Sequence, residues 1–130
     1  YYRTNAFDLR GVAEVDGVNG LILLPDNWTC PAGVIFKSGL SAGLPGDYAA
    51  CQTFTADQWS KLEAAGAVFL PAAGERYGTN VSRVQDRGNY WSATSYKSTD
   101  ASNPNFSSNV MADSNFSRAY GLSIRLVKDL

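Results

Sequence analysis

Five carboxylates are the side chains most able to support acid–base chemistry: Glu63, Glu75, Asp86, Asp100 and Asp113. Hydrolysis by paired carboxyl groups needs two of them at a defined separation. Glu63 falls in a predicted helix, whereas the other four fall in glycine-bearing or polar loops. Because nothing in the sequence fixes a pair, we interpret all five as solvated surface charges.

The chain of 130 residues contains no histidine. This removes the commonest general base near neutral pH and the commonest metal ligand. It also excludes serine and cysteine nucleophiles that depend on a neighbouring imidazole. The glycines do not have the spacing of a phosphate-binding loop. The sequence therefore predicts a protein that is not an enzyme and needs no cofactor.

A calcium site is the metal chemistry to consider, because the C-terminal third is rich in hard oxygen ligands. Only two of the five candidates carry a charge, and the spacing of an EF-hand is missing. We therefore predict no metal site. The candidates considered are Asp100, Asn103, Asn105, Asn109 and Asp113.

The two cysteines, Cys30 and Cys51, lie 21 residues apart, which is not a zinc spacing. A disulfide that closed this loop would add about 3 kcal/mol by the chain-entropy estimate. Two buried free thiols are the alternative, since cysteine is among the most buried residue types. The sequence leaves both possibilities open.

The totals indicate a single globular domain over residues 1–130. Apolar residues make up 45% of the chain, which is enough for one core. With a net charge of −1 and no basic run, electrostatic binding to nucleic acid is not expected. The longest apolar run, Gly20–Pro25, is too short to cross a bilayer. The chain begins without Met, and we interpret it as a trimmed or mature fragment. The absence of a leader sequence therefore carries no information about export.

One helix is predicted clearly, over Thr55–Gly66. Thr55 and Gln58 have the spacing of a capping box, and Gly66 provides a C-terminal stop. Trp59 and Leu62 lie three residues apart on one face, which is typical of a helix packed on a sheet.

Short strands are predicted around this helix, which gives an α+β class with an antiparallel sheet and long loops. The first twenty residues are expected to form loops and one edge strand, and residues 72–88 a charged loop. Residues 105–111 and 120–127 alternate with period two, so each is expected to place one face inward. The strands predicted are 21–24, 34–36, 90–94, 105–111 and 120–127, and residues 68–71 form a second apolar run that ends at a proline.

The segment between residues 95 and 120 differs from the rest of the chain. Of the 24 residues from Ser95 to Arg118, 14 are Ser, Thr, Asn or Asp, which outside a fold would favour disorder. Apolar residues recur within it and are expected to pin it to the core: Phe106, Val110, Met111 and Phe116. Tyr, Ser and Asn are favoured in binding loops. We predict a ligand-binding region, with an ordinary solvated loop as the alternative.

Four segments together resemble a known family: Gly20–Trp28, Thr55–Gly74, Gly88–Thr94 and Gly121–Val127. In this order, over roughly residues 18–128, they resemble the "major paralogous domain" of Bacteroidetes surface lipoproteins. That family is related to C-type-lectin-like domains. The resemblance implies a C-type-lectin-like α+β fold displayed outside a bacterial cell.

A narrower resemblance is to the variable proteins of diversity-generating retroelements, in which codons of the C-terminal strands are diversified at template adenines. It implies an adhesion-type domain that binds a protein or glycan on another cell or a phage, with a membrane link only through a lipid anchor outside this chain. A structural terminal module of a surface fibre or lipoprotein is the alternative. By position the ligand-binding set would be Tyr96, Ser98, Asp100, Ser102, Asn103, Asn105, Ser107, Asn109, Asp113, Asn115, Ser117, Arg118 and Tyr120.

The sequence departs from calcium-dependent lectins of this fold. Asn103-Pro104-Asn105 lacks the carboxylate of their Glu-Pro-Asn motif, and Trp91-Ser92-Ala93 stands in place of Trp-Asn-Asp. Calcium-dependent sugar binding is therefore not implied. The two cysteines match no motif of the formylglycine-generating enzymes, which share the fold, so that activity is not implied either.

Overall fold

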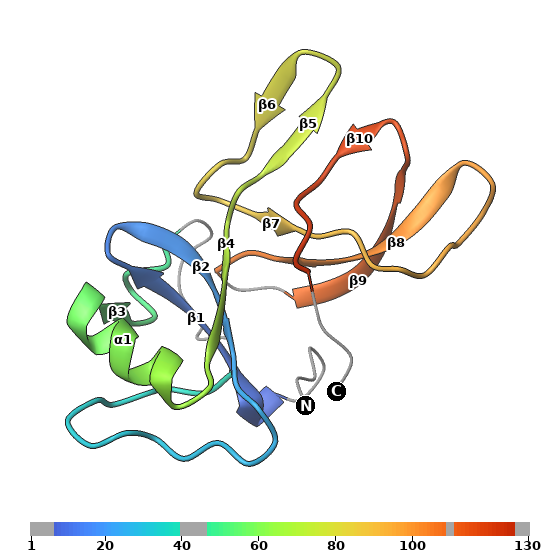
Figure 1. The fold of residues 1–130 in the computed structure, drawn as a ribbon. Helices are drawn as coiled ribbons and strands as arrows, with labels where there is room; N and C mark the ends of the chain where they lie inside the picture. The colour runs from blue at the N-terminus through green and yellow to red at the C-terminus, as the bar shows by residue number, and fades with distance from the viewer. Residues whose placement is uncertain (1–6, 40–46, 109–110, 127–130) are drawn as a thin grey trace.

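The computed structural model describes residues 7–39, 47–108 and 111–126. In this part of the chain the protein is mostly β, with one short α-helix and three small sheets, which confirms the α+β class. Figure 1 shows the helix covering one sheet, with two smaller sheets on the other side. The elements are η1 (Phe7–Leu9), β1 (Arg10–Val15), β2 (Val18–Leu23), β3 (Thr53–Phe54), α1 (Ala56–Ala64), β4 (Val68–Pro71), β5 (Glu75–Tyr77), β6 (Asn80–Ser82), β7 (Gly88–Asn89), β8 (Asp100–Phe106), β9 (Met111–Ser117) and β10 (Tyr120–Gly121).

The largest sheet has the strand order β3-β1-β2-β4, and with α1 it forms what we call the frame. Its two faces bury different clusters, because successive residues of a strand point to opposite faces. On one face Ile22 packs with Leu62 of α1. On the other face Leu21 packs with Tyr90 and Phe106 from the C-terminal half. The sheet of the frame is therefore the middle layer of the molecule and carries core on both sides.

The predicted helix is confirmed. α1 starts after Thr55, whose hydroxyl accepts a hydrogen bond from the Gln58 amide, while the Gln58 side chain accepts one from the Thr55 amide. Leu62 is fully buried, and the Trp59 ring lies 5.6 Å from the Phe69 ring of β4. Gly66 has φ +95°, the left-handed conformation that a helix stop favours.

The expectation of an edge strand near the N-terminus is wrong. β1 lies inside the sheet, paired antiparallel with β2 and parallel with β3, so both of its edges are hydrogen-bonded. Most of its residues are also buried. Gly11 of β1 lets the segment at Lys37 approach closely, since a Cβ at this position would lie 2.7 Å from the Lys37 carbonyl oxygen. The glycines of this region therefore allow close packing of the backbone.

The strand expected at residues 34–36 is also absent from the described structure. The Phe36 ring instead contacts the rings of Trp28 and Phe54. Next to it, the Gln52 side-chain amide bonds both the N–H and the carbonyl of Lys37. A side chain thus satisfies backbone groups that a neighbouring strand would otherwise pair.

Two three-stranded sheets make up the C-terminal half, with orders β7-β8-β9 and β10-β5-β6. The Phe106 ring lies over Gly88, where a Cβ would come within 2.0 Å of it. Residues 72–88 were expected to form a charged loop. This prediction is wrong, because the region contains the β5–β6 hairpin.

The strand predicted for residues 90–94 is reduced to a single bridge at Tyr90. Tyr90 donates its N–H to the carbonyl of Pro104, but a proline has no N–H with which to return the bond. The regular ladder from β7 to β8 therefore ends at Asn89.

Two other strand predictions are wrong in their limits. Residues 105–111 were expected to form one strand, yet β8 ends at Phe106 and β9 begins at Met111, and these two residues lie opposite each other. Residues 120–127 were expected to alternate inward and outward, but β10 ends at Gly121. Beyond it Ile124 and Leu126 are 69% and 89% exposed. Val110 and Val127 lie outside the described residues.

The two cysteines are not joined in a disulfide and lie in different surroundings. Cys30 is exposed. Cys51 is buried, and its thiol lies 3.7 Å from the carbonyl oxygen of Ser108. The buried-thiol alternative therefore describes Cys51 but not Cys30.

Candidate ligand-binding site

The β8–β9 hairpin carries most of the predicted ligand-binding residues. Directly opposed residues of an antiparallel pair share a face, so the register divides the hairpin into two sets. The Asp100 face consists of Asp100, Ser102 and Pro104 with Ser117, Asn115 and Asp113. The Asn103 face consists of Ala101, Asn103 and Asn105 with Phe116, Ser114 and Ala112.

Five predicted residues lie together on the Asp100 face: Asp100, Ser102, Asp113, Asn115 and Ser117. The Ser102 hydroxyl donates to Asn115 Oδ1 at 3.2 Å across the two strands. The three residues from β9 are exposed. This face therefore presents hydrogen-bonding groups to solvent in a fixed register.

Arg10 closes the Asp100 face at the end nearest the core. Its Nη1 lies 3.0 Å from the Met111 sulfur. Burial lowers the pKa of the Arg10 guanidinium, and the nearby Asp113 carboxylate opposes this effect. The frame and the hairpin thus meet at a charged contact.

The Asn103 face is partly interior, so it does not display all of its predicted residues. Asn103 is 1% exposed, and neither its side-chain oxygen nor its nitrogen has a hydrogen-bond partner. Asn89, which lies opposite Asn105, is fully buried and has an unpartnered Oδ1. Unpaired buried amide groups cost free energy. Asn103 was predicted to bind ligand, but it is buried inside the fold, where it affects stability instead of contacting a ligand.

The turn at residues 95–99 is held by Arg118. Its Nη2 donates to the Ser95 hydroxyl at 2.8 Å and its Nε to the Asp100 carbonyl at 3.4 Å. Its backbone N–H bonds the Thr99 carbonyl. The turn displays Tyr96, over whose ring Lys97 Nζ lies at 5.2 Å from the centroid, and Ser98. Arg118 thus orders a segment whose composition alone would leave it disordered.

Three aromatic rings join the β5–β6 hairpin to the β9–β10 turn, and we call them the aromatic row. The Tyr77 and Tyr120 rings lie 4.7 Å apart, and the Tyr120 and Phe116 rings meet edge to face at 5.1 Å. Tyr77 is 57% exposed. Figure 1 shows β10 beside the projecting β5–β6 hairpin.

Tyr77 is a candidate that the sequence interpretation missed, because residues 72–88 were expected to form a loop. The pair Gly78-Thr79 between Tyr77 and Asn80 is a two-residue hairpin signal that could have identified it. Such a hairpin places Tyr77 on a defined face.

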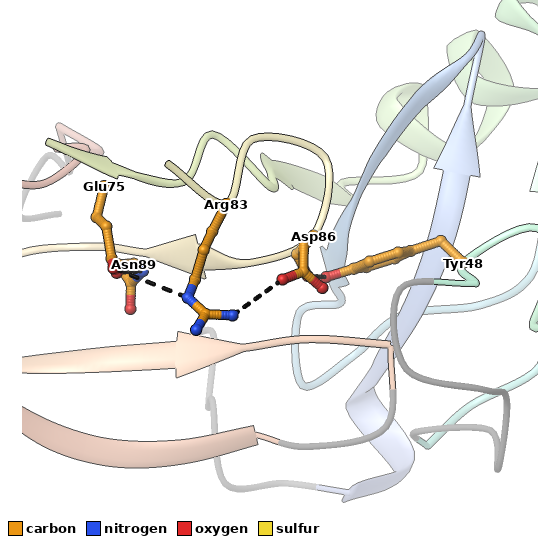
Figure 2. Close-up of polar contacts among 5 residues, drawn as sticks. All are labelled: Tyr48, Glu75, Arg83, Asp86 and Asn89. Atoms are coloured by element: carbon orange, nitrogen blue, oxygen red, sulfur yellow. Dashed lines mark hydrogen bonds and ion pairs between the residues drawn. The ribbon is translucent and has the colours of Figure 1, made fainter. Parts of the chain in front are cut away.

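A chain of polar contacts fixes the base of β5 (Figure 2). The Asn89 amide donates to Glu75 Oε2 at 2.9 Å, and Arg83 Nε lies 3.9 Å from Glu75 Oε1. Arg83 Nη1 also contacts Asp86 Oδ2 at 3.3 Å, while the Tyr48 hydroxyl donates to the Asp86 carbonyl at 2.9 Å. Burial, and then the Asp86 carboxylate, raise the pKa of Tyr48. The network therefore connects the β5–β6 hairpin to the core residue Tyr48.

Gln85 ties the same region to the frame. Its side-chain oxygen accepts the Asn19 N–H at 2.7 Å, and its side-chain nitrogen donates to the Gly17 carbonyl at 3.2 Å. Arg83 and Gln85 have φ values of +58° and +65°, which are uncommon for residues other than glycine. Such strain persists only where surrounding contacts hold it. Both ends of the β5–β6 hairpin are therefore anchored.

Two predicted ligand-binding residues, Ser107 and Asn109, lie outside the elements described above. Ser107 is half-buried just beyond β8, and Asn109 lies outside the described residues. Within the described ranges, no group of three or more Cys, Asp or Glu residues is arranged to hold a metal ion. No helix in the same ranges is long and apolar enough to span a membrane.

The fold and the site together define a small α+β domain with a polar and aromatic display at one end. A family model matches residues 52–127, and the chain belongs to this family, DUF8237, a domain of unknown function. The match covers α1 and both C-terminal sheets, but not β1 and β2, on which their core depends. No curated protein and no solved structure matches the chain.

Proposed function

We propose that this domain is a non-catalytic, surface-displayed binding domain whose ligand contacts the polar and aromatic end of the C-terminal sheets. The observation that carries the proposal is the aromatic row, which is partly exposed beside the turn held by Arg118. Tyrosine offers large contact area at low entropic cost, and Ser and Asn offer adaptable hydrogen bonds. Anchoring of both hairpins limits the order that binding must impose.

The resemblance to the "major paralogous domain" of Bacteroidetes surface lipoproteins supports display on the outer surface of a bacterial cell. We propose a C-type-lectin-like arrangement on the same basis. One capped helix on an antiparallel sheet, followed by polar hairpins, is compatible with it. The calcium motifs of that fold are missing here, so the proposed binding depends on side chains alone.

The polar hairpin is further proposed to be the diversified region of a retroelement variable protein. The positions suited to variation are those that are exposed: Tyr96, Ser98, Asp113, Asn115 and Ser117. Substitutions at such positions usually change stability by no more than about 0.5 kcal/mol. These exposed positions can therefore vary while the fold persists.

The genomic locus tests the proposal. We expect a near-repeat of the codons for residues 95–120 beside a reverse transcriptase gene, with mismatches confined to template adenines. Mismatches at the exposed positions, but not at Phe106, would identify the binding residues directly. A locus with neither repeat nor reverse transcriptase would contradict diversification and leave a domain with a fixed ligand.

A structural terminal module that packs against a partner subunit is the second candidate. It is favoured by the exposed Ile124 and Leu126, which alternate with Arg125 beyond the last strand. Exposed apolar residues that lie together often mark contacts with other proteins. Sedimentation of the native protein and of Ile124→Ser distinguishes the two functions. An assembly lost only in the variant supports the module, whereas monomers in both support ligand binding.

A further inference from the structure

The side of the sheet on which Arg118 lies connects it to the aromatic row. Ser95 bridges Ala101, and Ala101 lies opposite Phe116, so these three residues share the Asn103 face. Arg118 bonds the Ser95 hydroxyl, and Tyr120 contacts the Phe116 ring. Arg118 and the half-buried rings of Phe116 and Tyr120 therefore lie at the same end of one face.

The Arg118 guanidinium is oriented but not saturated. It has five N–H donors, and its two side-chain hydrogen bonds use Nε and one N–H of Nη2. Nη1 and the second N–H of Nη2 have no partner among the described residues, and the residue is exposed. These donors have the geometry that binds a carboxylate through both oxygens. The intramolecular bonds hold the guanidinium ready for such an anion.

The Tyr77 ring offers an exposed apolar surface next to the polar side chain of Asn80. Tyr120 packs against it at 4.7 Å with an angle of 36° between the rings, while 57% of Tyr77 stays exposed. Asn80 lies opposite Tyr77 on the same face of its hairpin and is exposed. A pyranose ring matches this arrangement, because it has an apolar C–H face and a rim of hydroxyl groups. A purely apolar ligand that covered Asn80 would leave its amide without a hydrogen-bond partner.

We propose that Tyr77, Tyr120 and Arg118 form a subsite for a sugar ring that carries a carboxylate, as in the hexuronate units of an acidic polysaccharide. The ring stacks on Tyr77 and the carboxylate binds Arg118. This inference rests on the proposed binding function and specifies its ligand class. Neither a bound cation nor the Asp100 face is needed for it.

Calorimetric titration of the native chain with an α-1,4-linked galacturonate trisaccharide tests the proposal. Its methyl ester is the matched control, because it keeps the rings and removes the charge. We expect the acid to bind and the ester to bind at least about tenfold more weakly, as loss of a charge-assisted bidentate contact predicts. Binding should also weaken as NaCl rises, since the contact is exposed.

Three variants locate the site. Tyr77→Ala removes the stacking surface, and Arg118→Lys keeps the charge but removes the planar fork; each should weaken binding roughly tenfold. Arg76→Gln is the matched control, because Arg76 alternates with Tyr77 along β5 and lies on the opposite face of the hairpin. It should bind like the native chain. Thermal melts establish that each variant is folded.

Two results would overturn the subsite: no binding of the acid by the native chain, or equal weakening by Arg76→Gln and Tyr77→Ala. The broader function has a separate test in the genomic locus. A diversified locus together with no binding of the trisaccharide would remove only the sugar subsite. Binding of the acid without a diversified locus would keep the subsite on a domain of fixed specificity.

Discussion

The frame differs from the displayed end, by which we mean the β5–β6 and β8–β9 hairpins together with β10, in the interactions that order it. In the frame, Val12, Leu21 and Ile22 are at most 1% exposed, and apolar burial on both faces of the sheet dominates. At the displayed end, Arg118 and Gln85 hold the chain in place through hydrogen bonds to backbone groups and to other side chains. The frame is therefore stabilised mainly by area removed from water, and the displayed end by specific polar contacts.

This difference bears on which residues can change. An apolar core loses stability whenever volume is lost, whichever residue is altered. A polar display depends on a few anchoring residues and tolerates change between them. The following variants test this contrast, from the largest expected effect to the smallest.

Phe106→Ala should have the largest effect, because Phe106 belongs to the β8–β9 hairpin but packs in the core against the frame and over Gly88. We expect the free energy of unfolding to fall by about 3–5 kcal/mol. Urea denaturation followed by tryptophan fluorescence measures it. A loss below about 1 kcal/mol would mean that the hairpin does not depend on the frame.

Tyr90→Phe tests the contact between the two regions. The Tyr90 hydroxyl donates to the Pro71 carbonyl at 2.8 Å, so we expect a loss of about 1 kcal/mol at neutral pH. Burial raises the pKa of Tyr90 to about 12, although the Ser123 hydrogen bond and Arg125 oppose it.

The pH dependence of the same variant has a definite sign. An unfolded tyrosine ionises near pH 10, whereas folded Tyr90 stays protonated to higher pH. Its contribution to stability is thus complete below about pH 10 and is lost as the pH rises towards 12. Melts between pH 8 and 12 should fall less steeply for Tyr90→Phe than for the native chain. Equal slopes would contradict the assignment.

Asn103→Val should raise stability by about 1 kcal/mol. It removes two buried polar atoms without partners and adds a residue that favours strands. Asn105→Val, at a half-buried position on the same face, is the control for strand preference. If Asn103→Val destabilises the protein while the control does not, the Asn103 amide binds an ordered water molecule.

Asn115→Tyr combined with Ser117→Asn should have the smallest effect. Both residues are exposed on the Asp100 face, so we expect a change within about 0.5 kcal/mol. Denaturant midpoints of the double variant and the native chain provide the comparison. A loss of 2 kcal/mol would show that this face is structural.

Sequence reasoning succeeded where local patterns decide the structure. The capping residues of α1 and the apolar run in β2 need no distant information. It failed where distant residues decide: Pro104 interrupts the ladder at Tyr90, and Gln52 replaces a strand beside Lys37. The end of β8 at Phe106 and the start of β9 at Met111 were not predicted, because residues 105–111 alternate like a single strand.

The candidate site was predictable in part. Composition identified the polar hairpin, but it could not say which residues share a face, because a shift of one residue in register reverses every side chain. Asn103 and Asn115 looked equivalent in the sequence, yet one is buried and the other exposed. Tyr77 joined the site only through its pairing with Tyr120.

The tip of the β5–β6 hairpin has a consequence for how this domain can change in length. Gly78 has φ +59°, and a Cβ at this position would meet no heavy atom within 4 Å. Extending the hairpin here costs little loop entropy, about 0.6 kcal/mol for each doubling of loop length. Adding two residues to each strand would move new side chains outward and keep Tyr77 on its face, whereas adding one would turn the new tip over. Insertions in pairs at this tip would therefore lengthen the reach of the binding end while the frame stays unchanged.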